Sequence, residues 1–270
     1  MGIIQLWHED VKDKLSALGF PLNLNLQSNF TVLLFEGCKV AVNLVTTDHA
    51  YLPDQLIGIQ ESFDKNGIYL VHLWQDIWQN RHDQVLGRIR SITGRNQRIH
   101  GRKTKITVIT QKQADEFLEA HHLQGTASAK YRFALTAGDD LLVVACFSNL
   151  RYMKKGGPVY RSAELIRFAT CTGFTVTGGF SKLLKYFIEL YRPDDIMSYA
   201  DRDWSLGKAY EQAGFQLSEI TPPSEIWLEE GTGKRFFAHR LPRVTDERPD
   251  ARRYRRIFNT GNLKYILYLH

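Results

Sequence analysis

The 270-residue sequence predicts a mixed α/β (α+β) fold built as two domains. Short segments rich in Val, Ile, Leu and Phe alternate with segments whose apolar residues follow the period of a helix. The length suits two domains of ordinary size. A strongly basic segment, residues 91–105, separates the two halves, and we place the boundary near Arg102. The predicted division is therefore 1–102, 103–245 and a basic tail, 246–270, that adds an edge strand.

The first domain is predicted to contain a β-hairpin, a third strand and three helices. Val11, Leu15 and Leu18 fall at i, i+4 and i+7, which is typical of one face of a helix. Glu36 and Gly37 form a turn between two apolar runs, which predicts the hairpin. The predicted helices are residues 10–18, 55–66 and 81–92, and the predicted strands are residues 29–35, 39–45 and 68–73.

The second domain is predicted to contain hairpins, further strands and three helices. The sequence AGDD is a good hairpin turn. Residues 151–158, RYMKKGGP, form a basic loop that is either mobile or in contact with phosphate. The predicted strands are residues 105–109, 131–135, 141–147, 164–176, 196–200, 225–228 and 235–239. The predicted helices are residues 111–121, 181–191 and a short helix that ends near Phe215.

The segment from Val176 to Ser181 has the composition of an anion-binding turn. It follows a predicted strand and precedes a predicted helix, and Gly178 and Gly179 stand where the chain must change direction. Ser181 is well placed as the N-cap of the helix. Free N–H groups and the helix dipole favour a phosphate at such a place. An ordinary glycine turn without a ligand fits the same residues.

This region resembles the second half of a GNAT-type N-acyltransferase domain. The TGGFSK turn, the strand end SYAD and the phrase AYEQAGF carry the resemblance. It implies a mixed, mostly antiparallel sheet and a turn that holds the pyrophosphate of acetyl-CoA or a related acyl-CoA. The turn departs from the usual coenzyme A signature, Q/R-x-x-G-x-G/A. The residues implied for cofactor binding are Thr177, Gly178, Gly179, Phe180, Ser181 and Lys182.

The phrases SYADRDW and GKAYEQAGF are also similar to phage Mom-type proteins, which modify adenine in DNA. Asp201 ends a predicted strand, where its carboxylate could orient or deprotonate an amine, and the GNAT resemblance implies that Tyr210 protonates a leaving thiolate. The similarity to Mom-type proteins implies a histidine at the end of the first helix of this domain, where His121 has the better packing and His122 the better access. The alternatives are a turn cap for Asp201, core packing for Tyr210 and an ordinary polar helix end for the histidines.

The first domain resembles the restriction-endonuclease-like core, especially its very-short-patch-repair relatives. The hairpin KVAVNLV and the phrases NGIYLVHLWQDIW and HDQVLGRIRSITG carry this resemblance. The family needs carboxylates on its second strand to hold a divalent metal. Asn43 and Val45 stand there instead, and Glu36, Asp48 and Asp54 lie outside the required pattern. We therefore expect no metal site and a degenerate domain that binds DNA or a partner, or only scaffolds the second domain.

Basic residues gather in two clusters, although the net charge is only +6. Such clusters are typical of proteins that bind a phosphate backbone. Two solvated basic faces are the alternative. The residues expected to contact nucleic acid, DNA above all, are Arg95, Arg98, Arg102, Lys103, Arg252, Arg253, Arg255 and Arg256.

The cysteines Cys38, Cys146 and Cys171 are far apart and odd in number, which favours reduced thiols over disulfides. No apolar run is long enough to span a bilayer, and the N-terminus lacks the pattern of a secretory signal. We therefore expect a cytoplasmic protein without a membrane partner.

Two classes of function follow. The first is a GNAT-like acyltransferase that acts on or near nucleic acid, with a nuclease-like binding domain that has lost cleavage. In it, Glu164 and Arg167, three residues apart, would support the catalytic groups. The second is a non-catalytic DNA-binding accessory protein built from two inactive enzyme folds. A serine hydrolase is a weaker option because no G-x-S-x-G elbow is present.

Overall fold

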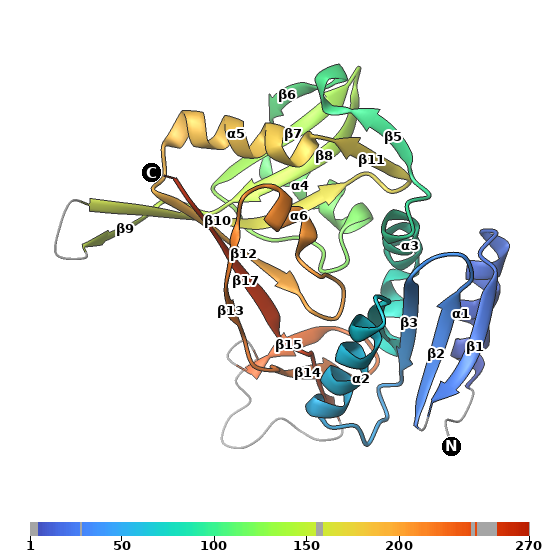
Figure 1. Cartoon of the computed structure of the whole chain (residues 1–270). Coiled ribbons are helices and arrows are strands. Elements are labelled where there is room, and N and C mark those ends of the chain that lie inside the picture. Colours follow the sequence, from blue (N-terminus) through green and yellow to red (C-terminus); the bar gives the residue numbers. More distant parts are fainter. Residues whose placement is uncertain (1–4, 28, 155–158, 239–240, 242–252, 270) are drawn as a thin grey trace. The chain divides into compact units, whose positions relative to one another are not determined.

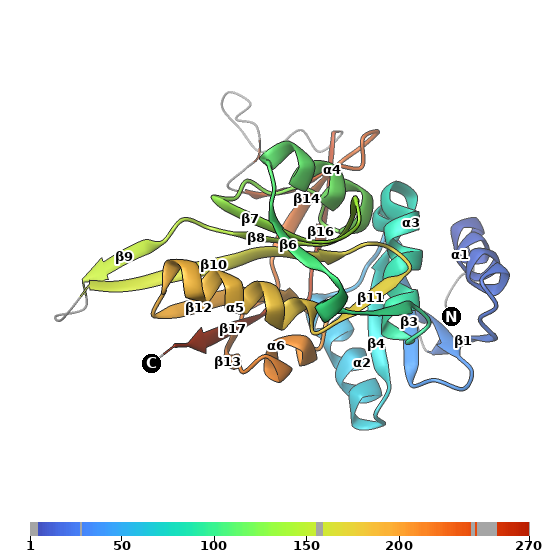
Figure 2. The ribbon, with the colours of Figure 1, turned by 90° about the horizontal axis from the view of Figure 1, so that it is seen from above.

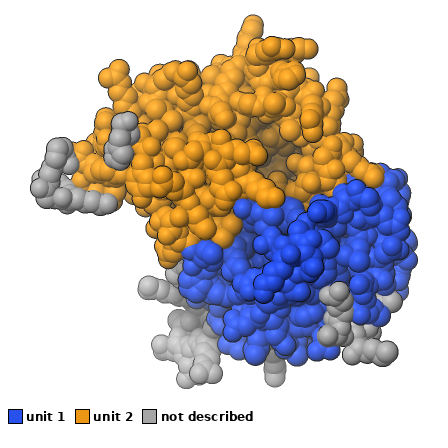
Figure 3. Space-filling view, in the orientation of Figure 1, with its two compact units in different colours: residues 1–82, 201–206, 220–262 blue, residues 83–200, 207–219, 263–270 orange. Residues whose placement is uncertain are grey.

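The computed structural model describes residues 5–27, 29–154, 159–238, 241 and 253–269 (Figure 1). Its internal contacts divide the chain into two compact units (Figure 3). Among the described residues, no helix is both long and apolar enough to cross a membrane. Unit 1 comprises residues 1–82, 201–206 and 220–262, and unit 2 comprises residues 83–200, 207–219 and 263–270.

Unit 1 is built on a four-stranded sheet with the order β1-β2-β3-β4. The first three strands are antiparallel, and β4 runs parallel to β3. The elements of this sheet and its helices are α1 (Leu6–Ala17), β1 (Leu22–Gln27), β2 (Phe30–Phe35), β3 (Val40–Val45), α2 (Pro53–Lys65), β4 (Tyr69–Trp74) and the start of α3 (Gln75–Ile92).

A second, three-stranded sheet in unit 1 has the antiparallel order β15-β14-β16. Ile226, Leu228 and Ile257 from this sheet are buried in one apolar cluster with Val45 and Trp74. This packing explains why residues 220–262 group with the N-terminal elements, a division that differs from the contiguous one expected from the sequence. The strands are β14 (Glu225–Glu229), β15 (Arg235–Phe237) and β16 (Tyr254–Phe258).

Buried polar contacts hold distant segments of unit 1 together. Asp203 is 2% exposed and accepts hydrogen bonds from the Thr260 backbone N–H at 3.1 Å and the Trp74 indole N–H at 3.2 Å. The Arg235 guanidinium donates to both oxygens of the buried Asp76 carboxylate, at 2.6 and 2.8 Å. Loss of one partner would leave a buried charge unpaired, which is strongly destabilising.

Unit 2 is built on a large sheet with the order β13-β17-β12-β10-β8-β7-β6, and β9 pairs with β10 beside this path. The small strands β5 and β11 form a separate parallel pair. The elements are β5 (Gln97–His100), η1 (Gly101–Lys103), β6 (Lys105–Val108), α4 (Gln111–His121), β7 (Tyr131–Ala137), β8 (Asp140–Phe147), β9 (Arg151–Lys154), β10 (Val159–Thr170), β11 (Phe174–Thr177), α5 (Gly179–Tyr191), β12 (Asp195–Asp201), α6 (Lys208–Gln212), β13 (Gln216–Ile220) and β17 (Asn262–Tyr268).

The large sheet is covered by α5 on one face and α4 on the other (Figure 2). The alternation along β8 shows this directly, because successive side chains of a strand point to opposite faces. Val143 and Ala145 belong to the cluster that contains Phe187 of α5, whereas Val144 and Cys146 belong to the cluster of α4. The sheet is therefore covered by apolar packing on both faces along β8.

The mixed α/β fold class is confirmed, and the sheet of unit 2 is mixed and mostly antiparallel as predicted. Strand β10 runs parallel to β12 for only three residue pairs, which end at Glu164 and Met197. Beyond this point the two strands no longer pair.

Several boundaries differ from the sequence predictions. Gly178, not Ser181, is the N-cap of α5, because its left-handed conformation (φ 75°) lets the helix begin at Gly179. The strand predicted over residues 164–176 is two strands, since a turn at Thr172 and Gly173 separates β10 from β11. The predicted loop at residues 151–158 begins as β9.

The tail strand β17 was predicted to lie at an edge of the sheet. It lies instead between β13 and β12. Its Tyr265 is 1% exposed, which fits an interior position. The strands β1, β5, β13 and β16 were not predicted. The helix predicted over residues 81–92 was placed too short, since α3 begins at Gln75 and has a kink at the non-helical Arg81. In the predicted hairpin of residues 225–239, β14 and β15 do pair, and His239 lies outside the described residues.

We expect Gly207→Ala to destabilise unit 2 by several kcal/mol. Gly207 has a φ of 74°, and a Cβ there would overlap the phenol of Tyr265. Gly138→Ala is the matched control, because Gly138 has a similar φ of 61° but no atom within 4 Å of a Cβ. The control should cost only the backbone strain, about 1–2 kcal/mol. Urea unfolding of both variants measures the difference, and equal losses would contradict the packing described for Tyr265.

Candidate functional site

The candidate site of unit 2 begins where β10 and β12 part. The carbonyl of Leu165, the first residue of β10 beyond the paired stretch, receives a side-chain donor instead of a strand partner. The Ser198 hydroxyl lies 2.9 Å from this carbonyl oxygen and 3.0 Å from the Tyr210 hydroxyl. A serine hydroxyl has one hydrogen and a carbonyl can only accept. Ser198 therefore donates to Leu165, and Tyr210 donates its hydrogen to the Ser198 oxygen.

Tyr210 is half-buried and packed between aromatic rings. Its ring stacks on Tyr265 with centroids 5.3 Å apart and meets Phe180 edge-on at 5.7 Å. The Tyr265 hydroxyl donates to Glu211 at 3.0 Å, and burial together with this carboxylate raises the pKa of Tyr265 to about 12. Tyr210 is thus held in place by its ring, while its hydroxyl lies at the gap between the strands.

Burial and the neighbouring polar groups shift the pKa of the Tyr210 hydroxyl in opposite directions. Burial raises the pKa of the Tyr210 hydroxyl, and the Ser198 hydrogen bond and the Arg88 and Arg167 guanidinium groups lower it, with burial the stronger effect. The phenol therefore stays protonated at neutral pH, and the two arginines would stabilise a phenolate formed during a reaction. Neither Ser198 nor Arg88 was expected from the sequence, although Ser198 lies on the same face of β12 as the buried Ile196 and Ala200.

Arg167 follows an irregularity in β10, where the register to β8 shifts between Leu165 and Arg167. Its guanidinium donates to the Gly125 carbonyl at 3.4 Å and to the Ile166 carbonyl at 2.9 Å. The loop after α4 therefore contacts β10 at the gap. The expected partner Glu164 is instead paired with Arg151 at 3.3 Å.

The two candidate histidines have different surroundings. The Nδ1 atom of His121 accepts the Thr172 N–H at 3.3 Å, and burial lowers the pKa of His121. Its ring meets Phe117 edge-on at 4.6 Å, so His121 anchors α4 to the turn after β10. His122 belongs to the loop that reaches Gly125, and its Nδ1 accepts the Gln124 N–H at 3.1 Å. Of the two, His122 is the one on the loop that contacts the gap.

Asp201 groups with unit 1, whereas Tyr210 groups with unit 2. The Asp201 carboxylate accepts the Asp203 N–H at 3.0 Å, and the Asp201 carbonyl accepts the Trp204 N–H at 3.0 Å. These are the contacts of a turn cap, the alternative that the sequence left open. A catalytic role for Asp201 stays a prediction.

The turn before α5 has backbone N–H groups without a recorded acceptor. Thr177, Gly178 and Ser181 are exposed, and the first intrahelical bond joins the Lys182 N–H to the Gly178 carbonyl at 3.0 Å. Within the described structure, no acceptor is recorded for the N–H groups of Gly179 or Ser181, nor for that of residue 180. Three aligned donors at a helix N-terminus favour an anion.

The side chains of Phe180 and Lys182 point into the protein rather than toward a ligand. Phe180 contacts Phe168 edge-on at 4.9 Å and also meets Tyr210, so it joins the turn to the gap. The Lys182 ammonium donates to the carbonyls of Gly101 and Thr104, at 2.9 and 2.5 Å. A phosphate contact through the Lys182 side chain, as the sequence suggested, is therefore not what this geometry supports.

The first basic cluster lies beside this turn. Strand β5 pairs with β11 so that Arg98 is opposite Thr175, and Gly101 approaches the turn so closely that a Cβ there would lie 3.1 Å from the Thr177 carbonyl. Arg95 lies on the same segment and is exposed. Three further exposed cations have no ion pair or hydrogen bond in the described part of the chain; they are Arg98, Arg102 and Lys103.

The second basic cluster has a different electrostatic character. Its arginines lie on or beside β16, and each pairs with a glutamate of β14 or the adjoining turn. The pairs are Arg253–Glu229 at 2.7 Å, Arg255–Glu230 at 2.8 Å and Arg256–Glu225 at 3.3 Å. Three cations and three anions leave no net charge, so the predicted nucleic-acid contact is weakened here. Arg252 lies outside the described residues.

The nuclease-like positions of unit 1 do not form a metal centre. Asn43 is 1% exposed, and its amide lies 3.2 Å from Nδ1 of the fully buried His72. Asp48 is 95% exposed at its side chain, and Glu36 accepts from Asn23. Among the described residues, no group of three or more His, Cys, Asp or Glu side chains could hold a metal ion.

No family model matches the chain, and no curated protein matches it by sequence. Solved structures do match. The ribosomal-protein-S18-alanine N-acetyltransferase from Escherichia coli is 14% identical over 61% of this chain and 93% of its own, with a TM-score of 0.38. A Bacillus subtilis acetyltransferase in complex with CoA is 16% identical over 62% and 100%, with a TM-score of 0.34. A KacTA–DNA complex is 18% identical over 43% and 86%, with a TM-score of 0.31. The ligands of this chain have to be inferred from its own residues.

We expect Ser198→Ala to raise the pKa of Tyr210 further, because the phenolate loses the hydroxyl that can donate to it. The Leu165 carbonyl also loses its donor, which should cost about 1–3 kcal/mol of stability. Tyrosinate absorbance during a pH titration, with Tyr210→Phe subtracted, measures the first effect. Ser198→Thr keeps the hydroxyl and should restore the wild-type value. An unchanged pKa in Ser198→Ala would contradict the described hydrogen bond.

Proposed function

We propose that unit 2 is an acyl-CoA-dependent N-acyltransferase whose pyrophosphate site is the turn of residues 177–181. The observation that carries this proposal is the set of unpaired backbone N–H groups at the start of α5. Phe180 connects the turn to Tyr210 at the gap between β10 and β12. Bound acyl-CoA would supply an activated thioester. The described residues fit such a ligand because backbone N–H groups can donate to the oxygens of a pyrophosphate without help from a lysine side chain.

In the proposed reaction, an amine nitrogen would bond to the thioester carbonyl carbon as the carbon–sulfur bond breaks. Tyr210 would give its proton to the leaving sulfur, and the proton lost by the amine would restore the Tyr210 hydroxyl. The thiolate that leaves needs a proton, and Tyr210 is the group whose hydroxyl faces the gap. The raised pKa of Tyr210 keeps this proton available at neutral pH. Ser198 can then turn its hydrogen toward the phenolate, and Arg88 and Arg167 stabilise the negative charge.

The proposed acceptor is an amine on nucleic acid, as the similarity to Mom-type proteins implies. The exposed, unpaired cations Arg98, Arg102 and Lys103 beside the turn support a polyanionic partner. We propose that unit 1 is a nuclease-like domain that binds without cleaving, which the buried Asn43–His72 contact supports.

The second candidate is a non-catalytic DNA-binding protein. The structural contacts of His121 and Asp201 favour it, because both side chains are used within the fold. Release of free thiol from acetyl-CoA in the presence of DNA separates the two proposals. DNA binding without any thiol release would support the second.

Ser181→Asp should weaken acetyl-CoA binding at least about tenfold. The new carboxylate would repel a pyrophosphate at the exposed N–H groups, yet an acidic residue in the first turn favours the helix, so the fold is preserved. Ser181→Asn is the neutral control of equal size and should bind nearly as the parent does. Calorimetry with acetyl-CoA measures both variants. The cofactor proposal fails if the parent protein shows no binding at millimolar ligand, or if the two variants bind alike.

Replacing Arg98, Arg102 and Lys103 together by Ala should reduce DNA affinity and lower the slope of log affinity against log salt by about 2–3, since each phosphate contact contributes about 0.9. The control removes both partners of one ion pair of the second cluster, with Arg253→Gln and Glu229→Gln in one protein. Its net charge is therefore unchanged.

The control should keep the parent's slope, and fluorescence anisotropy at several salt concentrations measures it. With magnesium or manganese, plasmid DNA should stay uncut if unit 1 has lost cleavage. A flat salt response of the parent protein, or clean nicking, would refute the corresponding part of the proposal.

A further inference from the structure

A group of tyrosines lies at the end of α5 that is opposite the glycine turn. Tyr191 ends this helix, and its ring lies against Tyr131 of β7 with centroids 4.0 Å apart. Burial and the nearby hydroxyls of Tyr191 and Tyr152 raise the pKa of Tyr131, which requires the three phenols to lie close together. We call Tyr131, Tyr152 and Tyr191 the tyrosine surface. Because α5 has 13 residues, this surface lies about 20 Å from the anion-binding turn.

The register of the large sheet places Tyr131 and Tyr152 on the face that α5 covers. Tyr131 is opposite Phe147, which is opposite Leu165 of β10, and Tyr152 is opposite Arg161 of the same strand. Leu165 and Arg161 are four residues apart, so their side chains point to one face. The β9–β10 pair that carries Tyr152 extends beyond the rest of the sheet (Figure 1, Figure 2).

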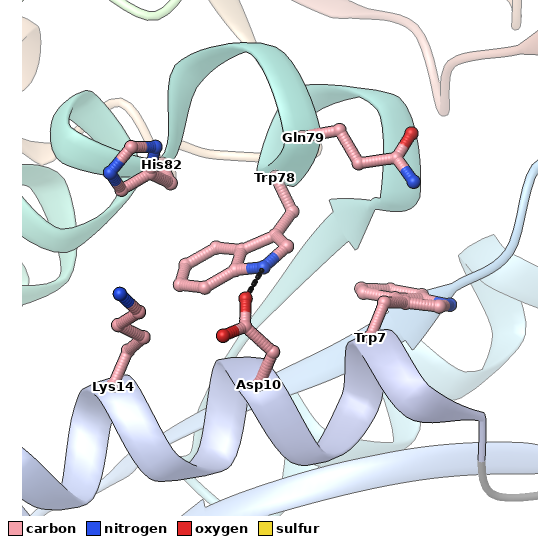
Figure 4. Close-up of a pocket in the computed structure, with 6 residues that line it drawn as sticks. All are labelled: Trp7, Asp10, Lys14, Trp78, Gln79 and His82. Carbon is pink, nitrogen blue, oxygen red and sulfur yellow. Dashed lines mark hydrogen bonds between the residues drawn. The ribbon is translucent and has the colours of Figure 1, made fainter.

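Tyr152 offers a free aromatic ring, since it is 67% exposed. The indoles of unit 1 differ in this respect. Trp7 and Trp78 line a hollow of about 320 Å³ (Figure 4), but they are 8% and 3% exposed, so their ring faces are covered by the fold. An exposed ring beside a packed pair of tyrosines is a place where a planar group can stack.

Two cations adjoin the tyrosine surface. Lys130 directly precedes Tyr131, Arg192 directly follows Tyr191, and both cations are exposed. No ion pair or side-chain hydrogen bond of Lys130 or Arg192 is recorded in the described part of the chain. Three acidic side chains of the same region are already neutralised. These pairs are Glu164–Arg151 at 3.3 Å, Asp194–Arg161 at 3.5 Å and Glu189–Lys185 at 3.8 Å. The surface is therefore positive, which favours an anionic partner.

Arg192 has a backbone conformation that arginine seldom adopts. It is the C-cap of α5, with a left-handed φ of 45° and ψ of 55°. Among the described residues it is the only one other than glycine with a positive φ. Glycine is the usual residue at such a helix end because a side chain strains the backbone there. Strained residues gather at functional sites, and a role of the Arg192 cation in binding accounts for this strain.

We propose that the tyrosine surface binds single-stranded nucleic acid. A base would stack on the exposed Tyr152 ring, and neighbouring phosphates would pair with Lys130 and Arg192. The bases of a duplex are already stacked and paired, so only a single strand offers a base to the ring. An acidic protein segment supplies negative charge but no planar base. This inference rests on the nucleic-acid partner of the proposed function and specifies its form, and it does not depend on acyl transfer.

The test is fluorescence anisotropy on the full chain with a single-stranded dA oligomer, an abasic oligomer of equal length and charge, and a DNA duplex. The dA oligomer should bind at least about tenfold more tightly than the abasic one, because only dA has bases to stack. Tyr152→Ala should remove most of this advantage, whereas Tyr152→Phe keeps the ring and should preserve it. Neither variant should change the affinity for the duplex.

Arg192→Gly should weaken dA binding about fivefold without lowering the melting temperature, because glycine adopts the left-handed conformation without strain. Lys112→Gln is the matched control. It removes one charge from α4, which covers the opposite face of the sheet, and should bind dA as the parent does.

A parent protein that binds the duplex but does not prefer dA to the abasic oligomer contradicts this inference alone. A parent protein that binds none of the three probes contradicts the proposed nucleic-acid partner as well. The inference is also overturned if Tyr152→Ala and Tyr152→Phe bind dA alike, if poly-glutamate binds as tightly as dA, or if Lys112→Gln loses as much affinity as Arg192→Gly.

Discussion

The hydrogen bond from Ser198 to the Leu165 carbonyl is the contact on which the candidate site depends. A sheet normally satisfies its backbone groups by strand pairing, and a buried carbonyl without a donor is costly. Where β10 and β12 part after Glu164 and Met197, a side chain has to replace the backbone donor that strand pairing would supply. Ser198 does so, and the same oxygen accepts the Tyr210 hydroxyl. The opening of the sheet and the position of its candidate acid therefore have one physical cause.

The turn before α5 is held by contacts of the Lys182 and Phe180 side chains. These contacts leave the backbone N–H groups of the turn without a recorded acceptor in the described structure. Lys182 donates to Gly101 and Thr104, which lie about 80 residues earlier in the chain, and this ties β5 and η1 to the turn. Phe180 anchors the turn to Phe168 from the other direction. The lysine and the aromatic ring thus fix the backbone donors without competing with them. Recognition of an anion here would rely on peptide N–H groups.

Sequence reasoning located the glycine turn and the helix after it because these depend on local spacing. Tyr210 was singled out by the family resemblance, and its role stays a prediction. Sequence reasoning missed Ser198, Arg88 and strand β5, because their roles arise only when segments far apart in the chain come together. The Arg98–Thr175 register in β5 and β11 joins residues 77 positions apart in the chain, and no local pattern encodes it. The N-cap was misplaced for a different reason. Ser181 has the better capping chemistry, but the left-handed backbone of Gly178 starts the helix earlier.

The two basic clusters illustrate why counting charges in a sequence does not give the field of a folded protein. Both look alike as strings of arginine and lysine. In the fold, β16 lies beside β14, and that pairing sets each described arginine of the second cluster against a glutamate 24–31 residues away. The first cluster has no acidic neighbour of this kind at Arg98, Arg102 or Lys103 within the described residues. Because surface ion pairs contribute little to stability, the main consequence of the pairing beside β16 is electrostatic: the described arginines of the second cluster are compensated by glutamates, whereas Arg98, Arg102 and Lys103 of unit 2 have no such partner among the described residues.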